Sequence, residues 1–204
     1  MKQLATKKRV HGKSYMIDIF NDPFNKRVRL DDIQGDIKGA IEEGERIAVE
    51  NKAEKLIAIA RKEQSFPLLE KGFQCEGVID GYFLGSDGYF FCKYFSSSRK
   101  ESRSWIEEDE LLRKVQLEKK ERTVPPLPVQ YSLKRVGKED AKILSSLYKQ
   151  VFQIYPTPLH DPEYVRKTME EGAVYFGVYA DGIIVSAASA DINSFYLNAE
   201  LTDC

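Results

Sequence analysis

The sequence has few of the residues that disulfide scaffolds and protein metal sites require. Its 204 residues include three cysteines and two histidines. Cys75, Cys92 and Cys204 lie far apart in the chain, and His11 and His160 do not complete a metal-ligand spacing with them. We therefore expect neither a metal site nor a disulfide framework, and we expect reduced thiols in a cytoplasmic protein.

The chain also lacks an excess of either charge and a long uninterrupted apolar run. Lys and Arg number 31 and Asp and Glu number 32, which gives a formal net charge of -1. This balance gives no electrostatic reason to expect nucleic acid or an anionic membrane as a partner. Residues 1–14 are polar and basic, unlike a secretory signal, and the apolar stretch 173–190 is broken at Asp181-Gly182. A hydrophobic content of 42% is enough for a core.

Residues 1–98 predict a compact α+β domain. Acidic residues favour the positive N-terminal end of a helix, so Asp31-Asp32 suggests a helix start. The apolar spacing after it, interrupted at Gly44, predicts a helix or a pair of helices over 33–52. A second, short helix is expected to end at Gly72, as a C-terminal glycine cap would do. Runs of apolar and β-branched residues predict strands at 13–20, 26–30, 55–61, 73–83 and 89–95.

A charged connector is predicted over residues 99–130. Apolar residues are spaced among charged ones between 99 and 122, which favours a solvated helix that lays one thin apolar stripe on a domain. The proline-rich segment 123–128 is typical of a stiff extended linker and marks the domain boundary.

Residues 131–204 predict a second α+β unit with the order strand, helix, helix, strand, strand, strand. Asp161 before Pro162 indicates a helix that begins with an N-cap and a proline in its first turn. Asp181-Gly182 is a strong hairpin signal. The expected elements are strands at 131–136, 173–179, 183–190 and 196–204 and helices at 138–152 and 161–171.

The last nine residues, 196–204, are expected to form one strand in which Glu200 and Thr202 face away from Leu201 and Asp203. Glu200 stands among residues that favour burial, and a buried carboxylate is costly unless it is paired or used. Asp203 points away from Glu200 in a regular strand, unless a bulge re-aims it. Because the chain ends here, we expect part of the catalytic machinery to lie beyond residue 204 or to be missing.

The segment VYFGVYADGIIVSAASADI, followed by NAELTDC, resembles the first half of the GNAT acetyltransferase fold. The closer resemblance is to the beta-lysine N-acetyltransferases, and it extends over most of the chain through residues 76–83, 168–172 and 199–203. Residues 69–95 also resemble the closing part of a GNAT domain. We therefore expect an incomplete GNAT fold, preceded by an α+β domain that is either a degenerate GNAT-like half or of unrelated descent.

This resemblance implies transfer of an acetyl group from acetyl-CoA to the side-chain amine of beta-lysine, with no metal. Polyamines or other small amines are alternative acceptors, and a non-catalytic GNAT-like binding module is an alternative function. A homodimer stays open as an assembly.

The resemblance also assigns site residues. Glu200 matches the position of a general base, and Asp203 is the alternative, either as base or as an anion for the substrate ammonium. The backbone of the last strand would pair with the pantetheine arm of acetyl-CoA through Leu201, Thr202, Asp203 and Cys204. The loop between the two helices would contact the acceptor through Tyr155, His160 and Asp161.

One departure from the family pattern concerns the cofactor. GNAT enzymes bind the CoA pyrophosphate on an Arg/Gln-x-x-Gly-x-Gly/Ala turn at a helix N-terminus, just after the fourth strand. The nearest internal candidate, QGDIKGA at 34–40, has the wrong spacing and places Asp36 where the phosphates would bind, so we interpret it as structural. The 204-residue chain is therefore expected to be only a fragment of the active enzyme, and the reading frame past Cys204 would test this.

Overall fold

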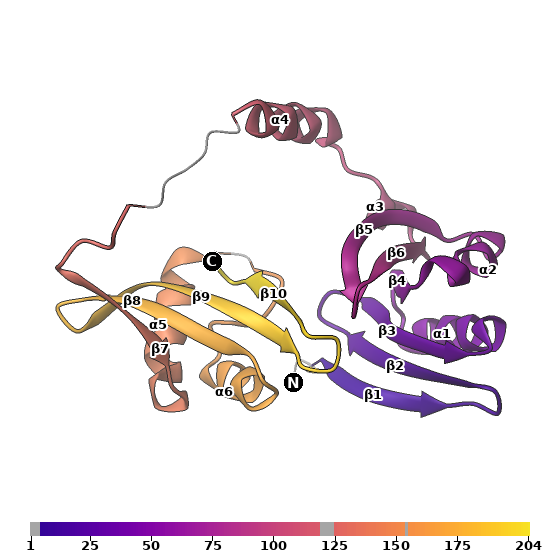
Figure 1. The fold of residues 1–204 in the computed structure, drawn as a ribbon, viewed down its shortest axis with the longest axis horizontal. Helices are drawn as coiled ribbons and strands as arrows, with labels where there is room; N and C mark the ends of the chain where they lie inside the picture. The colour runs from indigo at the N-terminus through magenta and orange to yellow at the C-terminus, as the bar shows by residue number, and fades with distance from the viewer. Residues whose placement is uncertain (1–4, 119–124, 154) are drawn as a thin grey trace. The chain divides into compact units, whose positions relative to one another are not determined.

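The computed structural model describes residues 5–118, 125–153 and 155–204. Its internal contacts divide the chain into two compact units, Met1–Glu121 and Arg122–Cys204, here called the N-terminal and C-terminal units. Each unit has its own β-sheet and helices (Figure 1), which confirms the α+β class. The predicted charged connector includes residues 119–122, and the predicted proline-rich linker includes residues 123 and 124. Residues 119–124 lie outside the described residues.

The N-terminal unit contains a six-stranded sheet in the order β1-β2-β3-β4-β6-β5. Strands β3 and β4 are parallel, and the other neighbours are antiparallel. Helices α1 (Ile37–Glu50) and α2 (Ser65–Glu70) contribute to its apolar core. The strands are β1 (Thr6–His11), β2 (Tyr15–Asp22), β3 (Arg27–Gly35), β4 (Lys55–Ala60), β5 (Gln74–Phe83) and β6 (Ser86–Tyr94).

The first helix begins later than the sequence predicts. Asp31 and Asp32 belong to strand β3, so the prediction that they start a helix is wrong. Asp32 is buried in the sheet because its carboxylate accepts hydrogen bonds from Arg61 (2.9 Å) and Gln34 (2.8 Å). The predicted end of the short helix α2 is confirmed, since Gly72 has a φ of 80°, as a glycine cap requires.

Helix α4 (Trp105–Leu117) lies within the predicted charged connector, and helix α3 (Ser97–Lys100) extends across the predicted start of the connector at residue 99. Every apolar side chain of α4 is more than half exposed, from 55% at Leu112 to 87% at Leu117. The predicted packing of an apolar stripe onto a domain is therefore not found within residues 105–117.

The C-terminal unit contains a four-stranded antiparallel sheet in the order β10-β9-β8-β7. Its apolar core joins one face of this sheet to the two helices (Figure 1). The chain order agrees with the predicted one: β7 (Tyr131–Val136), α5 (Ala141–Val151), α6 (Pro162–Glu170), β8 (Val174–Ala180), β9 (Ile183–Asn193) and β10 (Asn198–Thr202).

Two local predictions in the C-terminal unit are confirmed. Asp161 is the N-cap of α6, where its side chain accepts a hydrogen bond from the Glu163 backbone N–H at 3.0 Å, and Pro162 follows it. Asp181 and Gly182 have φ values of 50° and 81°, as the tight turn of a β-hairpin requires. Within the described residues no helix combines the length and the apolar character needed to cross a membrane.

Candidate active site

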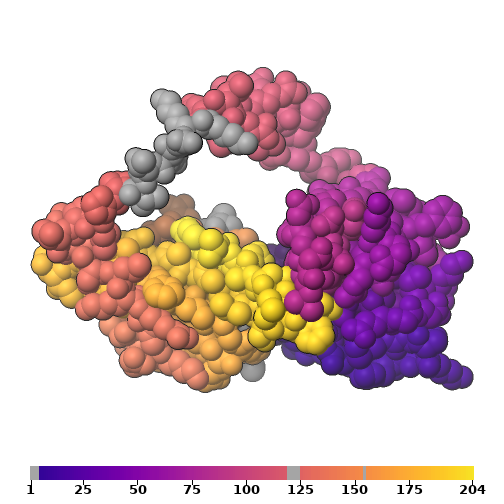
Figure 2. All heavy atoms as spheres, viewed as in Figure 1, coloured from indigo at the N-terminus to yellow at the C-terminus, as the bar shows by residue number. Residues whose placement is uncertain are grey.

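Strand β10 is shorter and more exposed than the sequence predicts. It covers only residues 198–202 and pairs only with β9 among the described strands. Leu197 and Asp203 have positive φ values, 52° and 55°, and these left-handed residues limit the strand at both ends. Glu200 is exposed and Leu201 is 81% exposed, so the expectation of a buried strand is wrong. The C-terminal residues, yellow in Figure 2, form part of the molecular surface.

Asp203 is the exception, because its side chain turns inward. Its positive φ removes it from the strand alternation, and only 9% of the residue is exposed. The carboxylate accepts hydrogen bonds from Ser189 Oγ at 2.6 Å, Tyr155 Oη at 3.0 Å and Thr202 Oγ1 at 3.4 Å. The backbone turn therefore re-aims Asp203 as a bulge would have done, and three neutral hydroxyl groups hold it.

Two tyrosines donate hydrogen bonds to Asp203, and a phenylalanine stacks between them. Tyr148, on α5, donates a hydrogen bond to the backbone oxygen of Asp203 at 3.2 Å. The rings of Tyr148, Phe152 and Tyr155 stack in sequence, with centroid distances of 5.9 and 4.2 Å. Burial raises the pKa of the Tyr155 hydroxyl, and its hydrogen bond to Asp203 raises that pKa further. Tyr155 therefore remains a protonated donor to the carboxylate near neutral pH.

Glu200 lies on the sheet face that also carries the Asp203 partners. In the β9–β10 register Glu200 stands opposite Asp191, and Thr202 stands opposite Ser189, so these four residues share one face. Two carboxylates directly opposite each other repel. The exposed Glu200 makes no hydrogen bond or ion pair within the described chain, and its carboxylate is accessible to a ligand or water.

The structure brings together only some of the predicted site residues. Tyr155 joins Asp203, as described above. Asp161 instead caps helix α6, and His160 is exposed without a hydrogen bond in the described segments. A role of His160 and Asp161 in acceptor binding stays a prediction.

Two residues of this cluster were missed by sequence analysis. Ser189 stands in a run of small residues, where nothing marks its hydroxyl for a role. Tyr148 has the spacing of an ordinary core position of α5, and only its hydrogen bond to Asp203 distinguishes it. The strand alternation could have placed Ser189 on the face of Thr202 only if the register of the two strands had been known.

The backbone assigned to the pantetheine arm lies along β10 and just after it. One edge of β10 pairs with β9, and the other edge pairs with no strand among residues 125–153 and 155–204. Leu201 and Thr202 thus lie on an edge strand, and Asp203 and Cys204 continue from it. An extended ligand can add to such an edge through main-chain hydrogen bonds.

The N-terminus of α1 is occupied by a side chain of the protein itself. Asp36 is the N-cap, and its carboxylate accepts hydrogen bonds from the backbone N–H groups of Lys38 (3.2 Å) and Gly39 (3.3 Å). These donors are the ones that an anion at the helix N-terminus would use. The structure therefore agrees with the interpretation of residues 34–40 as structural.

Replacing Asp36 by alanine should destabilise the N-terminal unit by about 1 kcal/mol, because two N–H groups of α1 lose their acceptor. Chemical denaturation measures this loss. The KM for acetyl-CoA should stay unchanged, and a change in it of tenfold or more, roughly 1.4 kcal/mol, would contradict the structural interpretation.

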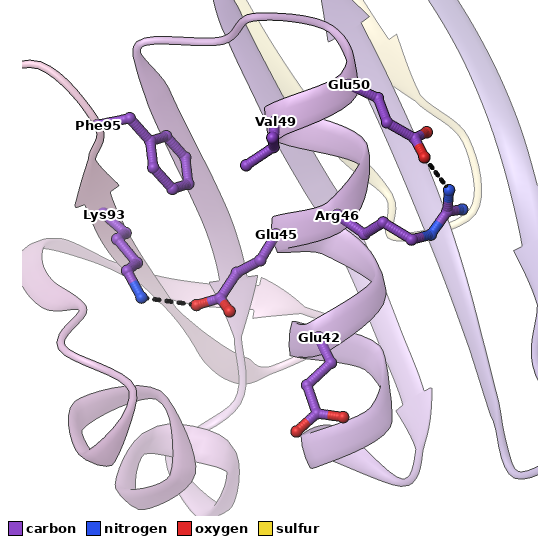
Figure 3. A pocket seen from close by; sticks show the side chains of 7 residues that line it. All are labelled: Glu42, Glu45, Arg46, Val49, Glu50, Lys93 and Phe95. Carbon is purple, nitrogen blue, oxygen red and sulfur yellow. Dashed lines mark hydrogen bonds and ion pairs between the residues drawn. The ribbon is translucent and has the colours of Figure 1, made fainter.

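The N-terminal unit has a surface depression of about 460 Å³ beside α1 and the end of β6 (Figure 3). Glu45 pairs with Lys93 at 2.7 Å, and Arg46 pairs with Glu43 at 2.6 Å and also with Glu50. These ion pairs satisfy the charges around the depression within the protein. It contains none of the predicted site residues, and we do not assign a ligand to it.

Comparison with known proteins finds relatives over most of the chain, although no protein-family model matches it. The N-acetyltransferase YodP of Bacillus subtilis is 37% identical over 189 residues, which cover 90% of this chain and 66% of that protein. The beta-lysine N(6)-acetyltransferase of Methanosarcina mazei is 32% identical over 196 residues, covering 86% of this chain and 70% of that protein. The protein of the same name from Methanococcus maripaludis is 31% identical, with coverages of 88% and 65%.

The chain thus spans about two-thirds of the length of these relatives. Among solved structures, a tandem GNAT protein from the clavulanic acid biosynthesis pathway aligns with 93% of this chain and 60% of its own, at 12% identity and a TM-score of 0.49.

Proposed function

Since this chain belongs to the GNAT family of N-acetyltransferases, we propose that the protein transfers an acetyl group from acetyl-CoA to the side-chain amine of beta-lysine or of a closely related diamine. The similarity to proteins named beta-lysine N(6)-acetyltransferases carries this proposal, because it covers 86% and 88% of the chain and so includes both units.

The proposal includes a domain organisation. Residues 131–204 are proposed as the first half of the catalytic GNAT domain, since β7, α5, α6, β8, β9 and β10 follow one another in the order expected for that half. Residues 1–98 are proposed as a GNAT-like closing half, and 99–130 as the connector. In this scheme the N-terminal unit has a structural role. Its helix α1 does not bind the CoA phosphates, because the Asp36 side chain already occupies the N-terminus of that helix.

The chemistry requires a neutral amine. A lysine-type amine has a pKa of ~10.4, so one proton must be removed before its lone pair can attack the thioester carbonyl. We assign this proton to Glu200, which accepts it directly or through a water molecule. The new C–N bond then forms as the C–S bond breaks, and the CoA sulfur leaves as a thiolate that takes up the second proton, which the acetylated nitrogen loses as it becomes an amide.

The exposed edge beyond Glu200 supports the proposed contact with acetyl-CoA. Main-chain groups of Leu201, Thr202, Asp203 and Cys204 would pair with the amides of the pantetheine arm. This arrangement would place the thioester beside the strand that carries the base.

The acceptor can be tested directly by a substrate panel. The release of the CoA thiol by the full-length protein is measured with beta-lysine, lysine, spermidine and a histone peptide as acceptors. We expect kcat/KM to be highest for beta-lysine, by about tenfold or more, because a site built to bind charged groups rejects analogues that place them differently. A preference for spermidine or the peptide would overturn the acceptor assignment. Binding of acetyl-CoA without turnover of any amine would instead favour the non-catalytic module.

A further inference from the structure

We propose that Asp203 binds the ammonium group of the acceptor that is not acetylated, and that Ser189 and Tyr155 are positioning residues that aim the Asp203 carboxylate at it. This inference rests on the proposed function, because it concerns the second amine of a diamine substrate. It assigns the two amines to two different carboxylates, with Glu200 serving the reacting amine.

Three aspartates are buried in the described chain, Asp22, Asp32 and Asp203. Asp22 pairs with Arg27 at 2.9 Å, and Asp32 pairs with Arg61 at the same distance. Asp203 has no Lys, Arg or His partner within the described residues. Because a buried carboxylate is costly unless a cation compensates its charge, the missing partner of Asp203 is expected to be a ligand cation.

The Asp203 carboxylate is also held in place by groups that carry no charge of their own. Its three donors are hydroxyl groups, and a neutral donor orients a carboxylate without neutralising it. The positive φ of Asp203 is uncommon for a residue other than glycine and costs backbone energy. Tyr148, which binds the backbone oxygen, helps to maintain this conformation.

The backbone spacing of Glu200 and Asp203 is of the order of a short diamine. Strand residues rise about 3.3 Å each, so the two strand steps from Glu200 to Thr202 span roughly 7 Å, and Asp203 follows directly after the strand end. In beta-lysine four carbons separate the two amine nitrogens, and a chain of that length, with one hydrogen bond at each end, spans a distance of the same order. Both carboxylates belong to the face that carries Ser189 and Thr202.

The experiment pairs a substrate truncation with a substitution. Beta-lysine is compared with 6-aminohexanoate, which keeps the reacting amine and the carboxylate but lacks the β-amine. Asp203→Asn should raise the KM for beta-lysine by about 10- to 100-fold, the range for a hydrogen bond to a charged group. It should leave kcat within about threefold and leave the KM for 6-aminohexanoate and for acetyl-CoA unchanged. An equal fall in kcat with both acceptors would indicate that Asp203 acts as a base. An unchanged KM for beta-lysine would indicate that Asp203 does not bind the acceptor. Either result overturns the proposal.

The positioning residues are tested in the same assay. Tyr155→Phe and Ser189→Ala should each raise the KM for beta-lysine by about 3- to 10-fold, as expected for one lost neutral hydrogen bond, with no effect on 6-aminohexanoate. Ser189→Thr, which restores a hydroxyl, should recover most of the loss. Tyr175→Phe is the matched control, since the buried Tyr175 hydroxyl contacts Thr168 at 2.9 Å and not Asp203. Equal effects of Tyr155→Phe and Tyr175→Phe would show that the cluster is merely structural.

A binding measurement separates this inference from the proposed function. Beta-lysine is titrated calorimetrically into the native protein and into Asp203→Asn, without acetyl-CoA. Binding that depends on Asp203, with no acetylation of any amine, would overturn the proposed function and support the ammonium site. The absence of beta-lysine binding to the native protein, with its thermal unfolding intact, would overturn the ammonium site.

Discussion

Replacing Glu200 by glutamine is expected to lower kcat by about 100-fold or more, the usual contribution of a general base. The glutamine side chain has nearly the same shape but cannot accept a proton. The KM for acetyl-CoA should change little, since the proposed contacts of the pantetheine arm are with the backbone. The dependence of kcat on pH should also lose the rise that reports deprotonation of the base in the enzyme–substrate complex.

Asp191→Asn is the matched control for this result. Asp191 stands directly opposite Glu200 on β9, so its replacement removes one negative charge from the same face. We expect kcat to stay within about threefold in this variant, a change in the barrier of less than ~1 kcal/mol. Turnover of Glu200→Gln close to that of the native protein would eliminate Glu200 as the base. Loss of kcat in both variants would indicate a field effect instead of proton transfer.

The parts of the fold that could be predicted from the sequence are those set by local chemistry. The cap at Asp161, the turn at Asp181-Gly182 and the helix end at Gly72 each depend on the conformation of one or two residues. Such signals are independent of the rest of the chain, which explains why they were predicted correctly.

The errors arose where distant parts of the chain decide the outcome. Asp32 was predicted at a helix start, but Arg61, 29 residues away, pairs with it inside the sheet. Strand β1 was missed because its side chains are mostly polar and exposed. Its Arg9 is oriented by two hydrogen bonds to Asp18 on β2, at 2.6 and 2.8 Å, which no local pattern reveals.

In the candidate site, too, local sequence signals were predicted correctly and features that depend on distant residues were not. The motif identified Glu200 and Asp203, but a regular strand would have pointed Asp203 away from Glu200 and left Glu200 buried. The direction of Asp203 depends on its positive φ and on the hydroxyl of Ser189, which comes from a neighbouring strand. Sequence analysis could therefore name the residue but not its surroundings.

Replacing Asp32 by alanine is expected to destabilise the N-terminal unit by about 3 kcal/mol, the range for removing one partner of a buried ion pair. Arg61 would lose the carboxylate that it binds at 2.9 Å while it remains three-quarters buried against the Phe83 ring. Urea denaturation measures the loss. Asp32→Leu combined with Arg61→Met should recover most of it, because both charges are then removed. A loss below ~1 kcal/mol for Asp32→Ala would mean that the pair contributes no more than a surface ion pair.

For Asp203 we expect the opposite effect on stability. Since no cation of the described chain pairs with Asp203, Asp203→Asn leaves no buried positive charge behind. The free energy of unfolding of Asp203→Asn should therefore fall by less than about 1 kcal/mol. If the buried charge of the native carboxylate destabilises the fold in order to bind a ligand, this variant is more stable than the native protein. A loss at Asp203 as large as that at Asp32 would indicate a structural role and would weaken its assignment to the acceptor ammonium. The two variants, measured side by side, thus separate a carboxylate that serves the fold from one that serves binding.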